Sequence, residues 1–432
     1  MSSRFFTIIR GKLSGEFSGR YRIIYLLAVA EAMLCIIFPG QLQIYDHDTW
    51  TYLETWGNYD IFRPSTFVDI YRTPVYPLFL GITTLNQQLP MATVVLVQWI
   101  VFIASIPFFK RLSFMLVRRK SITFWMTLFY ATFWGSIEVN YCLMTESLTQ
   151  SLIVMFVYFM VRSLLRPGAK SIYCSALCLL ILVFLRPAML YLPVIYIAVC
   201  VYIWTRNHRE GLRGLLSAAA ICLSLYGYAS AFNHQHGFFA MSDVSDYNNY
   251  IRCVTFGIND EKCYPPYLLP HLTTTDSVTG QITWTKDIPP YVAHTKDFHE
   301  GVTSNIKTHP DKFALAAVWT FTSFWRCRAN QCLFLYWPIG MMLTLGMDTA
   351  AVMVMIYLII AVAAMWRSKV LMPVPLLIAG IWIAHALVSW LGAYWAFDRL
   401  IQPVFPMLIL IFGQLCSFYT KTRTAAEVFH PL

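Results

Sequence analysis

Residues 21–52 read YRIIYLLAVAEAMLCIIFPGQLQIYDHDTWTY, a long apolar run followed at once by two carboxylates and a histidine. The apolar part, residues 21–40, is long enough to cross a hydrocarbon core of about 30 Å as a helix. The polar part, Asp46, His47 and Asp48, must be solvated, paired or placed around a charged substrate, because burying an unpaired carboxylate is costly. The stretch therefore predicts a membrane helix that leads into a polar site at the membrane surface.

Similar apolar runs recur from one end of the chain to the other. The sequence is 58% hydrophobic and 12% charged, whereas soluble domains carry roughly 25% charged residues. Because lipid cannot satisfy open backbone groups, each crossing should be a helix. We expect an all-α polytopic membrane protein, a single membrane domain over residues 1–432, with about 12 transmembrane helices. The expected spans are 21–40, 91–109, 122–140, 143–161, 171–185, 187–205, 214–232, 313–329, 331–347, 349–366, 371–391 and 400–419.

The number of spans depends on residues 313–347, which form two helices or one helix plus an interfacial segment. The count therefore lies at about 11 to 13 crossings. The charges fix the orientation more firmly. With the N-terminus cytoplasmic, the inner segments carry 22 of the 32 Lys and Arg, while the outer loops and helix ends carry 18 of the 22 Asp and Glu. This positive-inside bias predicts cytoplasmic N- and C-termini, and it explains the net charge of +10 without a nucleic-acid partner.

Two large loops are expected on the outer side, at residues 41–90 and 233–312. In the first, Thr49–Gly57 is predicted to form a short helix along the membrane surface, capped by Asp48 or Thr49. The second should be a loop with short helices. No cytoplasmic segment exceeds about 22 residues, and no GxxxxGK[ST] or GxGxxG motif is present. ATP-driven transport and cytoplasmic nucleotide-sugar chemistry therefore lose support.

Cys253 and Cys263 both lie in the second large loop. The sequence leaves open whether they form a disulfide or stay reduced, because spacing alone does not decide pairing.

The strongly polar groups near the membrane collect on the expected outer side. They are Asp46, His47, Asp48, Arg63, Arg72, Glu146, Arg186, His309, Asp398 and Arg399. A carboxylate can act as general base toward a hydroxyl, and arginines bind phosphate and stabilise a phosphate leaving group. The combination suits sugar transfer from a lipid-linked phosphate.

Several short motifs appear in a fixed order along the chain. They are Asp48 with Tyr52, the run Arg72-Thr73-Pro74-Val75-Tyr76-Pro77, Thr145-Glu146-Ser147-Leu148, Leu185-Arg186-Pro187, His309-Pro310, and Asp398-Arg399 with Pro403 and Pro406. In order, sidedness and spacing this set resembles the GT-C superfamily of integral-membrane glycosyltransferases. The resemblance is to the bacterial family-39-like branch, related to protein O-mannosyltransferases and lipid A aminoarabinose transferases. It implies a GT-C-type architecture.

The resemblance also implies roles for individual residues. Asp48 would be the catalytic base that activates the acceptor hydroxyl for inverting attack on the anomeric carbon, and Asp46 is the competing assignment. Glu146 would be a second acid that orients the acceptor or helps to hold a divalent cation. The donor phosphate would be held by Arg72, Arg186 and Arg399, with Tyr52, Tyr76 and His309 completing the substrate-binding set.

The function implied is transfer of a sugar from a polyprenyl-phosphate donor to a glycan, lipid or protein acceptor at the periplasmic face of a bacterial inner membrane. The chain lacks the extra C-terminal soluble domain of many relatives, which leaves acceptor recognition to residues 233–312. The resemblance implies no required cofactor, and it leaves open whether a divalent cation takes part.

Simpler roles remain open for the same residues. Asp46 and Asp48 could be helix caps or solvated loop acids, and Arg186 and Arg399 could be structural. An O-antigen polymerase or ligase would place its essential arginines in two late outer loops. A secondary transporter would place ionisable residues at mid-membrane, as Glu31 does.

Overall fold

The structure is a computed structural model that describes residues 19–37, 47–60, 62–133, 139–275, 282–286, 288–293, 295–326, 347–368, 373–392 and 400–419. Asp46, Asp398, Arg399 and all of the expected span 331–347 except Met347 lie outside the described residues. Asp48 is described in its backbone alone.

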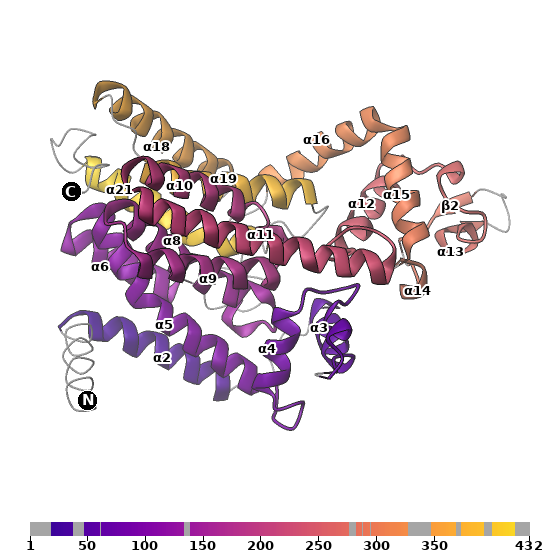
Figure 1. The fold of residues 1–432 in the computed structure, drawn as a ribbon, viewed down its shortest axis with the longest axis horizontal. Coiled ribbons are helices and arrows are strands. Elements are labelled where there is room, and N and C mark those ends of the chain that lie inside the picture. Colours follow the sequence, from indigo (N-terminus) through magenta and orange to yellow (C-terminus); the bar gives the residue numbers. More distant parts are fainter. Residues whose placement is uncertain are drawn as a thin grey trace.

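The described chain is almost entirely helical (Figure 1). The longer helices are α2 (Tyr21–Ile37), α5 (Ala92–Val117), α6 (Lys120–Thr132), α8 (Thr145–Leu165), α9 (Ala169–Leu185), α10 (Leu192–Arg206), α11 (His208–His236), α16 (Pro310–Arg326), α18 (Met347–Ser368), α19 (Pro373–Gly392) and α21 (Phe405–Tyr419). The shorter elements are α3 (His47–Gly57), η2 (Pro64–Phe67), α4 (Val75–Thr83), η3 (Pro187–Met189), α12 (Val244–Thr255), η4 (Glu261–Cys263), α13 (Leu269–Leu272), β1 (Thr273–Thr275), β2 (Ile282–Trp284), α14 (Pro290–Ala293), α15 (Lys296–Thr308) and η5 (Gln402–Val404).

Within the described residues, seven helical segments are long and apolar enough to cross a membrane. They are Ala92–Val117, Thr145–Leu165, Pro187–Arg206, His208–His236, Met347–Trp366, Pro373–Gly392 and Gln402–Tyr419. The apolar helix α9 is shorter, at 17 residues. These helices agree with the expectation of an all-α polytopic membrane protein.

One expected span differs from the helix that is found. The apolar run at 122–140 was expected to be one continuous helix, but α6 ends at Thr132. The next residue, Phe133, has an extended backbone with φ −68° and ψ 133°. Gly135 and Ser136 follow in the sequence, and both residue types favour leaving a helix. Apolar composition predicted the run but not this break.

One end of the bundle gathers basic residues, and we call it the basic end. It is formed by the starts of α2 and α6 and the ends of α5 and α21. The Lys110 ammonium lies 4.2 Å from the Tyr21 ring centroid, which joins α5 to the start of α2. The Ser417 hydroxyl donates to the Val117 carbonyl over 3.5 Å, which joins the ends of α21 and α5.

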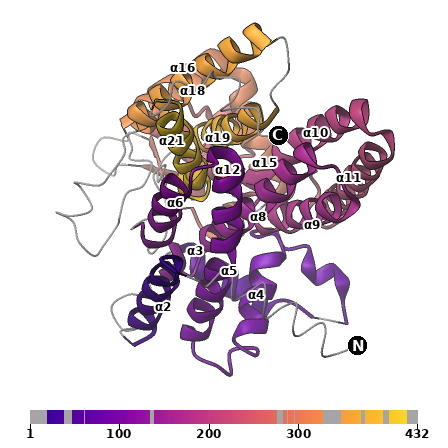
Figure 2. The same cartoon turned by 90° about the vertical axis from the view of Figure 1, so that its left-hand side faces the viewer.

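The opposite end carries the long connections, and we call it the loop end. Figure 1 shows α12 to α15 and the small hairpin there, away from α6. Helix α11 is 29 residues long and reaches out toward these elements. It stops at Gly237, whose φ of +84° is the left-handed C-cap that glycine adopts without strain. The end view in Figure 2 shows α8 nearer the centre of the bundle and α18 at its rim.

Residues 244–308 fold around their own apolar core, and we call them the α12–α15 unit. That core contains Tyr250, Ile251, Tyr264, Leu268, Leu272, Val292, Phe298 and Val302. The strands β1 and β2 pair antiparallel with Thr274 opposite Thr283. Short helices were expected at residues 233–312, and α12 to α15 lie there, but residues 233–236 belong to α11 and residues 310–312 to α16. Cys253 and Cys263 are both free thiols.

The α12–α15 unit is attached to the bundle through the last turn of α19. Arg252 is 1% exposed, and its guanidinium donates to the Leu391 carbonyl over 2.9 Å and to the Trp390 carbonyl over 3.1 Å. The Asn248 amide donates to the Gly392 carbonyl over 3.1 Å. The last carbonyls of a helix have no partner within the helix, so α12 caps α19 and fixes the unit to the loop end.

Candidate active site

A buried ion pair joins α8 and α9 at the loop end. Arg186 Nη1 lies 3.2 Å from Glu146 Oε1, and the two side chains are 9% and 4% exposed. Glu146 is the second residue of α8, where a carboxylate is favoured by the positive end of the helix dipole. Thr145 also donates its hydroxyl to Glu146 Oε2 over 3.2 Å. The carboxylate is therefore held from two directions.

The position of Arg186 follows from the proline after it. A residue before proline is disfavoured in the α conformation, and Arg186 has φ −151° and ψ 111°. Helix α9 therefore ends at Leu185, and η3 begins at Pro187 with the proline in its first turn. This break turns the arginine side chain to the start of α8 rather than along its own helix.

The first turn of α3 lies beside the segment that leads into α8. The Thr49 hydroxyl, which is fully buried, donates to the Leu143 carbonyl over 3.1 Å. Leu143 is three residues before Glu146, and Asp48 is the neighbour of Thr49. The backbone of Asp48 is thus close to the start of α8.

The expected cap of α3 differs from the one found. Asp48 or Thr49 was expected to precede the helix as its cap, but α3 begins at His47 and both lie inside its first turn. The burial of Thr49 against Leu143 gives its hydroxyl a tertiary partner, which removes the need for a capping role.

The Arg72-x-Pro-x-Tyr run packs onto α3. Arg72 Nε donates to the Thr51 hydroxyl over 2.8 Å, and the Arg72 guanidinium carbon lies 4.5 Å from the Tyr52 ring centroid. Tyr52 in turn meets Tyr76 edge to face, with 4.7 Å between the ring centroids. Three of the sequence-predicted residues, Tyr52, Arg72 and Tyr76, therefore form one contact chain.

Tyr76 connects this chain to Glu146. Its ring is fully buried, and its hydroxyl donates to Gln98 Oε1 over 3.0 Å. Gln98 Nε2 donates to the carbonyls of Asn140 and Cys142, over 3.2 and 3.0 Å, just before α8. Burial, together with the negative charges that Tyr52 and Glu146 can carry, raises the pKa of Tyr76 well above its usual range. Tyr76 therefore stays protonated and acts as a hydrogen-bond donor.

His309 has different neighbours. It ends α15, and its Nε2 lies 3.7 Å from Asp260 Oδ2, within the same part of the loop end. Its acidic neighbour is thus Asp260, whereas Glu146 pairs with Arg186. The predicted set therefore divides into a group around Glu146 and Arg186, His309 apart from it, and Asp46 and Arg399, which lie outside the described residues.

Two buried polar residues, His385 and Gln402, were not singled out as site residues from the sequence. His385 in α19 is fully buried. Its ring centroid lies 5.8 Å from that of Tyr191, and it is close enough to Arg186 to interact electrostatically. Gln402 in η5 is 3% exposed. The available signal was a polar residue inside an otherwise apolar run, which also describes many structural residues.

The described residues contain no group of three or more His, Cys, Asp and Glu placed to hold a metal ion. Glu146, the acid that the family resemblance offers as a cation ligand, is already ion-paired with Arg186. A cation there would compete with the guanidinium, so we assign no chemical step to a metal.

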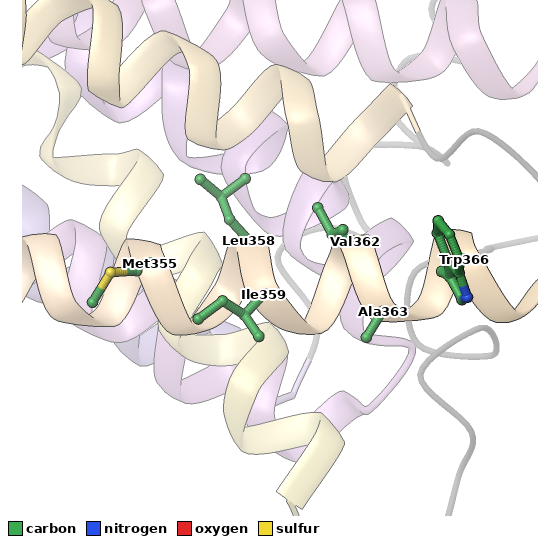
Figure 3. Close-up of a pocket in the computed structure, with 6 residues that line it drawn as sticks. All are labelled: Met355, Leu358, Ile359, Val362, Ala363 and Trp366. Carbon is green, nitrogen blue, oxygen red and sulfur yellow. The ribbon is translucent and has the colours of Figure 1, made fainter.

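A groove on α18 is almost entirely apolar. Figure 3 shows its lining along one helix: Met355, Leu358, Ile359, Val362, Ala363 and Trp366. The Trp366 indole N–H is the one polar group among these six side chains, and none of the six can act as a general acid or base. At the rim of a membrane bundle such a face suits contact with lipid tails, so we leave it out of the candidate active site.

Comparisons with known proteins add no family assignment. No protein-family model matches this chain, and no curated protein matches it. The geometry at the loop end therefore carries the functional argument.

Proposed function

We propose that this protein is a glycosyltransferase of GT-C type that moves a sugar from a polyprenyl-phosphate donor to an acceptor hydroxyl. The acceptor is a glycan, a lipid or a protein. The observation that supports the proposal most is the buried Glu146–Arg186 ion pair, placed at the loop end beside the first turn of α3. It puts a fixed acid and a fixed cation next to the backbone of Asp48.

The chemistry needs one base and a stabilised leaving group. Asp48 takes the proton of the acceptor hydroxyl, whose oxygen attacks the anomeric carbon as the bond to the phosphate oxygen breaks. The electron pair of that bond leaves with the polyprenyl phosphate, whose negative charge Arg186 and Arg72 stabilise. Glu146 holds Arg186 in place, and Asp46 remains the competing base.

The orientation in the membrane follows from the charges. The basic end carries Arg20, Arg22, Lys110, Arg111, Arg118, Arg119 and Lys120. By the positive-inside rule this end faces the cytoplasm. The loop end then faces the periplasm of a bacterial inner membrane, where the donor and the acceptor meet. With this orientation both chain termini are cytoplasmic.

Sugar transfer by the purified protein in detergent tests the proposal. The donors are a panel of polyprenyl-phosphate sugars, and membrane extract supplies the acceptor. We expect Asp48→Asn to lower the transfer rate by about 10²- to 10⁴-fold, the range for loss of a general base, while donor binding is kept. Arg186→Lys should lower the rate because a single ammonium replaces the guanidinium fork.

Two further variants sharpen the assignment. Asp46→Asn separates the two candidate bases, since only the true base should lose activity. Asp60→Asn is a matched control in the same loop, because the Asp60 carboxylate is 43% exposed and its partners are local: the 78% exposed Arg63 across 3.6 Å and the Phe62 backbone N–H over 2.9 Å. Full activity in both Asp46→Asn and Asp48→Asn would contradict the assignment of the base and move it to Glu146.

One observation favours a secondary transporter as the second candidate. Glu31 lies midway along α2, and its Oε2 is buried without a hydrogen-bond partner among the described residues. Ionisable groups at mid-membrane mark ion pathways. Solute uptake by reconstituted vesicles, with no turnover of any lipid-linked sugar, would support this alternative over the glycosyltransferase.

A further inference from the structure

Two residues on α19 and η5 carry buried polar atoms without hydrogen-bond partners among the described residues. Most buried polar atoms in native proteins have a hydrogen-bond partner, and an exception calls for a ligand, a water or a functional role. Gln402 is the one residue in the described part with two buried side-chain atoms, Nε2 and Oε1, that both lack a partner. Burying an amide whose nitrogen and oxygen have both lost their hydrogen bonds to water costs free energy of folding.

His385 also has a buried polar atom without a hydrogen-bond partner, at one of its two ring nitrogens. Its Nε2 lies 2.8 Å from the Leu400 carbonyl, and because a carbonyl only accepts, Nε2 must donate. In the neutral imidazole the other nitrogen, Nδ1, then carries a lone pair. That Nδ1 is buried and has no partner among the described residues.

The segment 400–402 ties these two groups together. Leu400 accepts from His385, and Gln402 follows two residues later at the start of η5. η5 packs on α8 and α19. η3, which follows Arg186, packs on α19, and the His385 ring centroid lies 5.8 Å from that of Tyr191, just after η3. The unpartnered groups therefore lie on the side of the bundle that holds the ion pair. Arg186 Nη1 itself has the Glu146 ion pair but no hydrogen bond of acceptable geometry.

The hydrogen-bonding atoms without partners define which ligand would fit beside them. His385 Nδ1 can accept one hydrogen bond, Gln402 can donate and accept, and Arg186 can donate to an anionic oxygen. A sugar hydroxyl both donates and accepts, and a phosphate oxygen only accepts. The complementary ligand therefore combines neighbouring hydroxyls with a phosphate.

We propose that His385 and Gln402 bind the sugar hydroxyls of the lipid-phosphate donor, next to the phosphate held by Arg186. This assignment rests on the proposed function and adds to it the residues that select the sugar. A site built to hydrogen-bond a hydroxyl rejects an analogue that lacks it, because the buried polar groups are then left unpaired. His385 and Gln402 thus set which sugars are transferred.

The test uses the difference between a binding residue and a buried structural residue. Gln402→Met removes two unpartnered polar atoms and keeps the volume, so the ligand-free protein should unfold at the same or a higher temperature. Its KM for polyprenyl-phosphate hexoses should rise by about tenfold or more, since each lost hydrogen bond of about 1.4 kcal/mol is worth tenfold in affinity. The value of kcat should change less.

His385→Gln gives an independent measurement. The glutamine amide nitrogen can replace Nε2 and keep the bond to Leu400, whereas nothing replaces the Nδ1 lone pair. We expect a raised KM and a weaker preference between a hexose donor and its deoxy analogues.

Ser113→Ala is the matched control for removal of an unpartnered polar atom. Ser113 lies toward the basic end of α5, and its hydroxyl is buried without a partner in the described structure. Its removal should affect thermal unfolding in the same direction as Gln402→Met and leave KM unchanged.

The outcomes separate the two proposals. Wild-type protein that transfers sugar, with unchanged KM and unchanged donor preference in both Gln402→Met and His385→Gln, overturns the sugar-binding assignment alone and leaves water as the partner of these groups. Wild-type protein that neither transfers sugar nor is stabilised by any polyprenyl-phosphate hexose overturns the proposed function and the assignment with it.

Discussion

Glu146 and Arg186 place two full charges where almost no water reaches them. Desolvating two ions costs several kcal/mol each, and their mutual attraction offsets this only when the geometry is good and the remaining hydrogen bonds are made. A buried ion pair is therefore weak evidence for stability. The proposed binding of a charged ligand would give a reason for a buried pair beside α3 and near Tyr76.

A double-mutant cycle at this pair should show strong coupling. We expect Glu146→Gln and Arg186→Met each to lower the free energy of unfolding by about 3–5 kcal/mol, because each leaves one buried charge uncompensated. The double variant should lose less than the sum of the two. Denaturant unfolding in detergent measures all three.

The ion pair between Lys296 and Glu300 on α15 is the control, since the two side chains are 53% and 60% exposed and the pair spans one helical turn. Glu300→Gln should cost about 0–1 kcal/mol. Additive effects at Glu146 and Arg186 would mean that the two charges do not depend on each other.

The contact between α3 and α4 sets the position of the Asp48 backbone. Gly81 of α4 lies so close to Trp56 of α3 that a Cβ atom at Gly81 would overlap the indole ring. The Trp56 indole nitrogen also donates to Asn86 Oδ1 over 3.0 Å, just after α4. The short helix is thus held against α4 by a site that only glycine fits.

Gly81→Ala should push α3 away from α4. We expect a loss of about 1–3 kcal/mol in stability, the usual cost of overpacking, together with a fall in transfer activity as Asp48 moves. Gly57→Ala is the control within α3, because a Cβ there meets nothing within 4 Å. Wild-type activity in Gly81→Ala would show that α3 need not stay in place.

The hydrogen bonds that attach α12 to the end of α19 lead to a prediction about the stability of these two helices. Arg252→Met removes two hydrogen bonds to the carbonyls of Trp390 and Leu391. Hydrogen bonds from a charged group contribute about 1.5–3 kcal/mol, so thermal unfolding should occur at a lower temperature and amide exchange in the last turn of α19 should accelerate. Lys307→Met, at an exposed position of the same unit, should change neither. Unchanged exchange in α19 would rule out the capping role.

The molecule as a whole separates charge from long connections. Basic residues occupy one end of the bundle, and α3, α4 and the α12–α15 unit occupy the other (Figure 1). Short loops and helix ends that are rich in Lys and Arg stay on the cytoplasmic side of a membrane. The fold thus places this basic cluster and the long connections at opposite ends, as the proposed orientation requires.

Epitope tags at the two ends test this orientation. A tag at the exposed turn of Gly257 should be accessible to antibody in spheroplasts with an intact inner membrane. A tag between Pro167 and Gly168, in the connection of α8 to α9, should be accessible only after permeabilisation. Equal accessibility of both tags, or the reverse pattern, would contradict the proposed sidedness.

The sequence alone determined the class of fold and several local features. Apolar run length indicated the membrane helices, and the charge bias indicated their direction. Because a residue before proline avoids the α conformation, the end of α9 at Arg186 could also be expected. The short helix after Thr49 was expected as well, with its start two residues away from where it lies. These features depend on interactions within a few residues along the chain.

Only the tertiary structure decided which polar groups meet. Glu146 and Arg186 are 40 residues apart and pair because α8 packs on α9. The environment of His385 and Gln402 depends on how α19 and η5 lie against α8. Apolar helix faces can pack in many registers, so composition cannot select one. The proposed roles of His385 and Gln402 could not be read from the sequence, because they depend on packing between helices rather than on any local pattern.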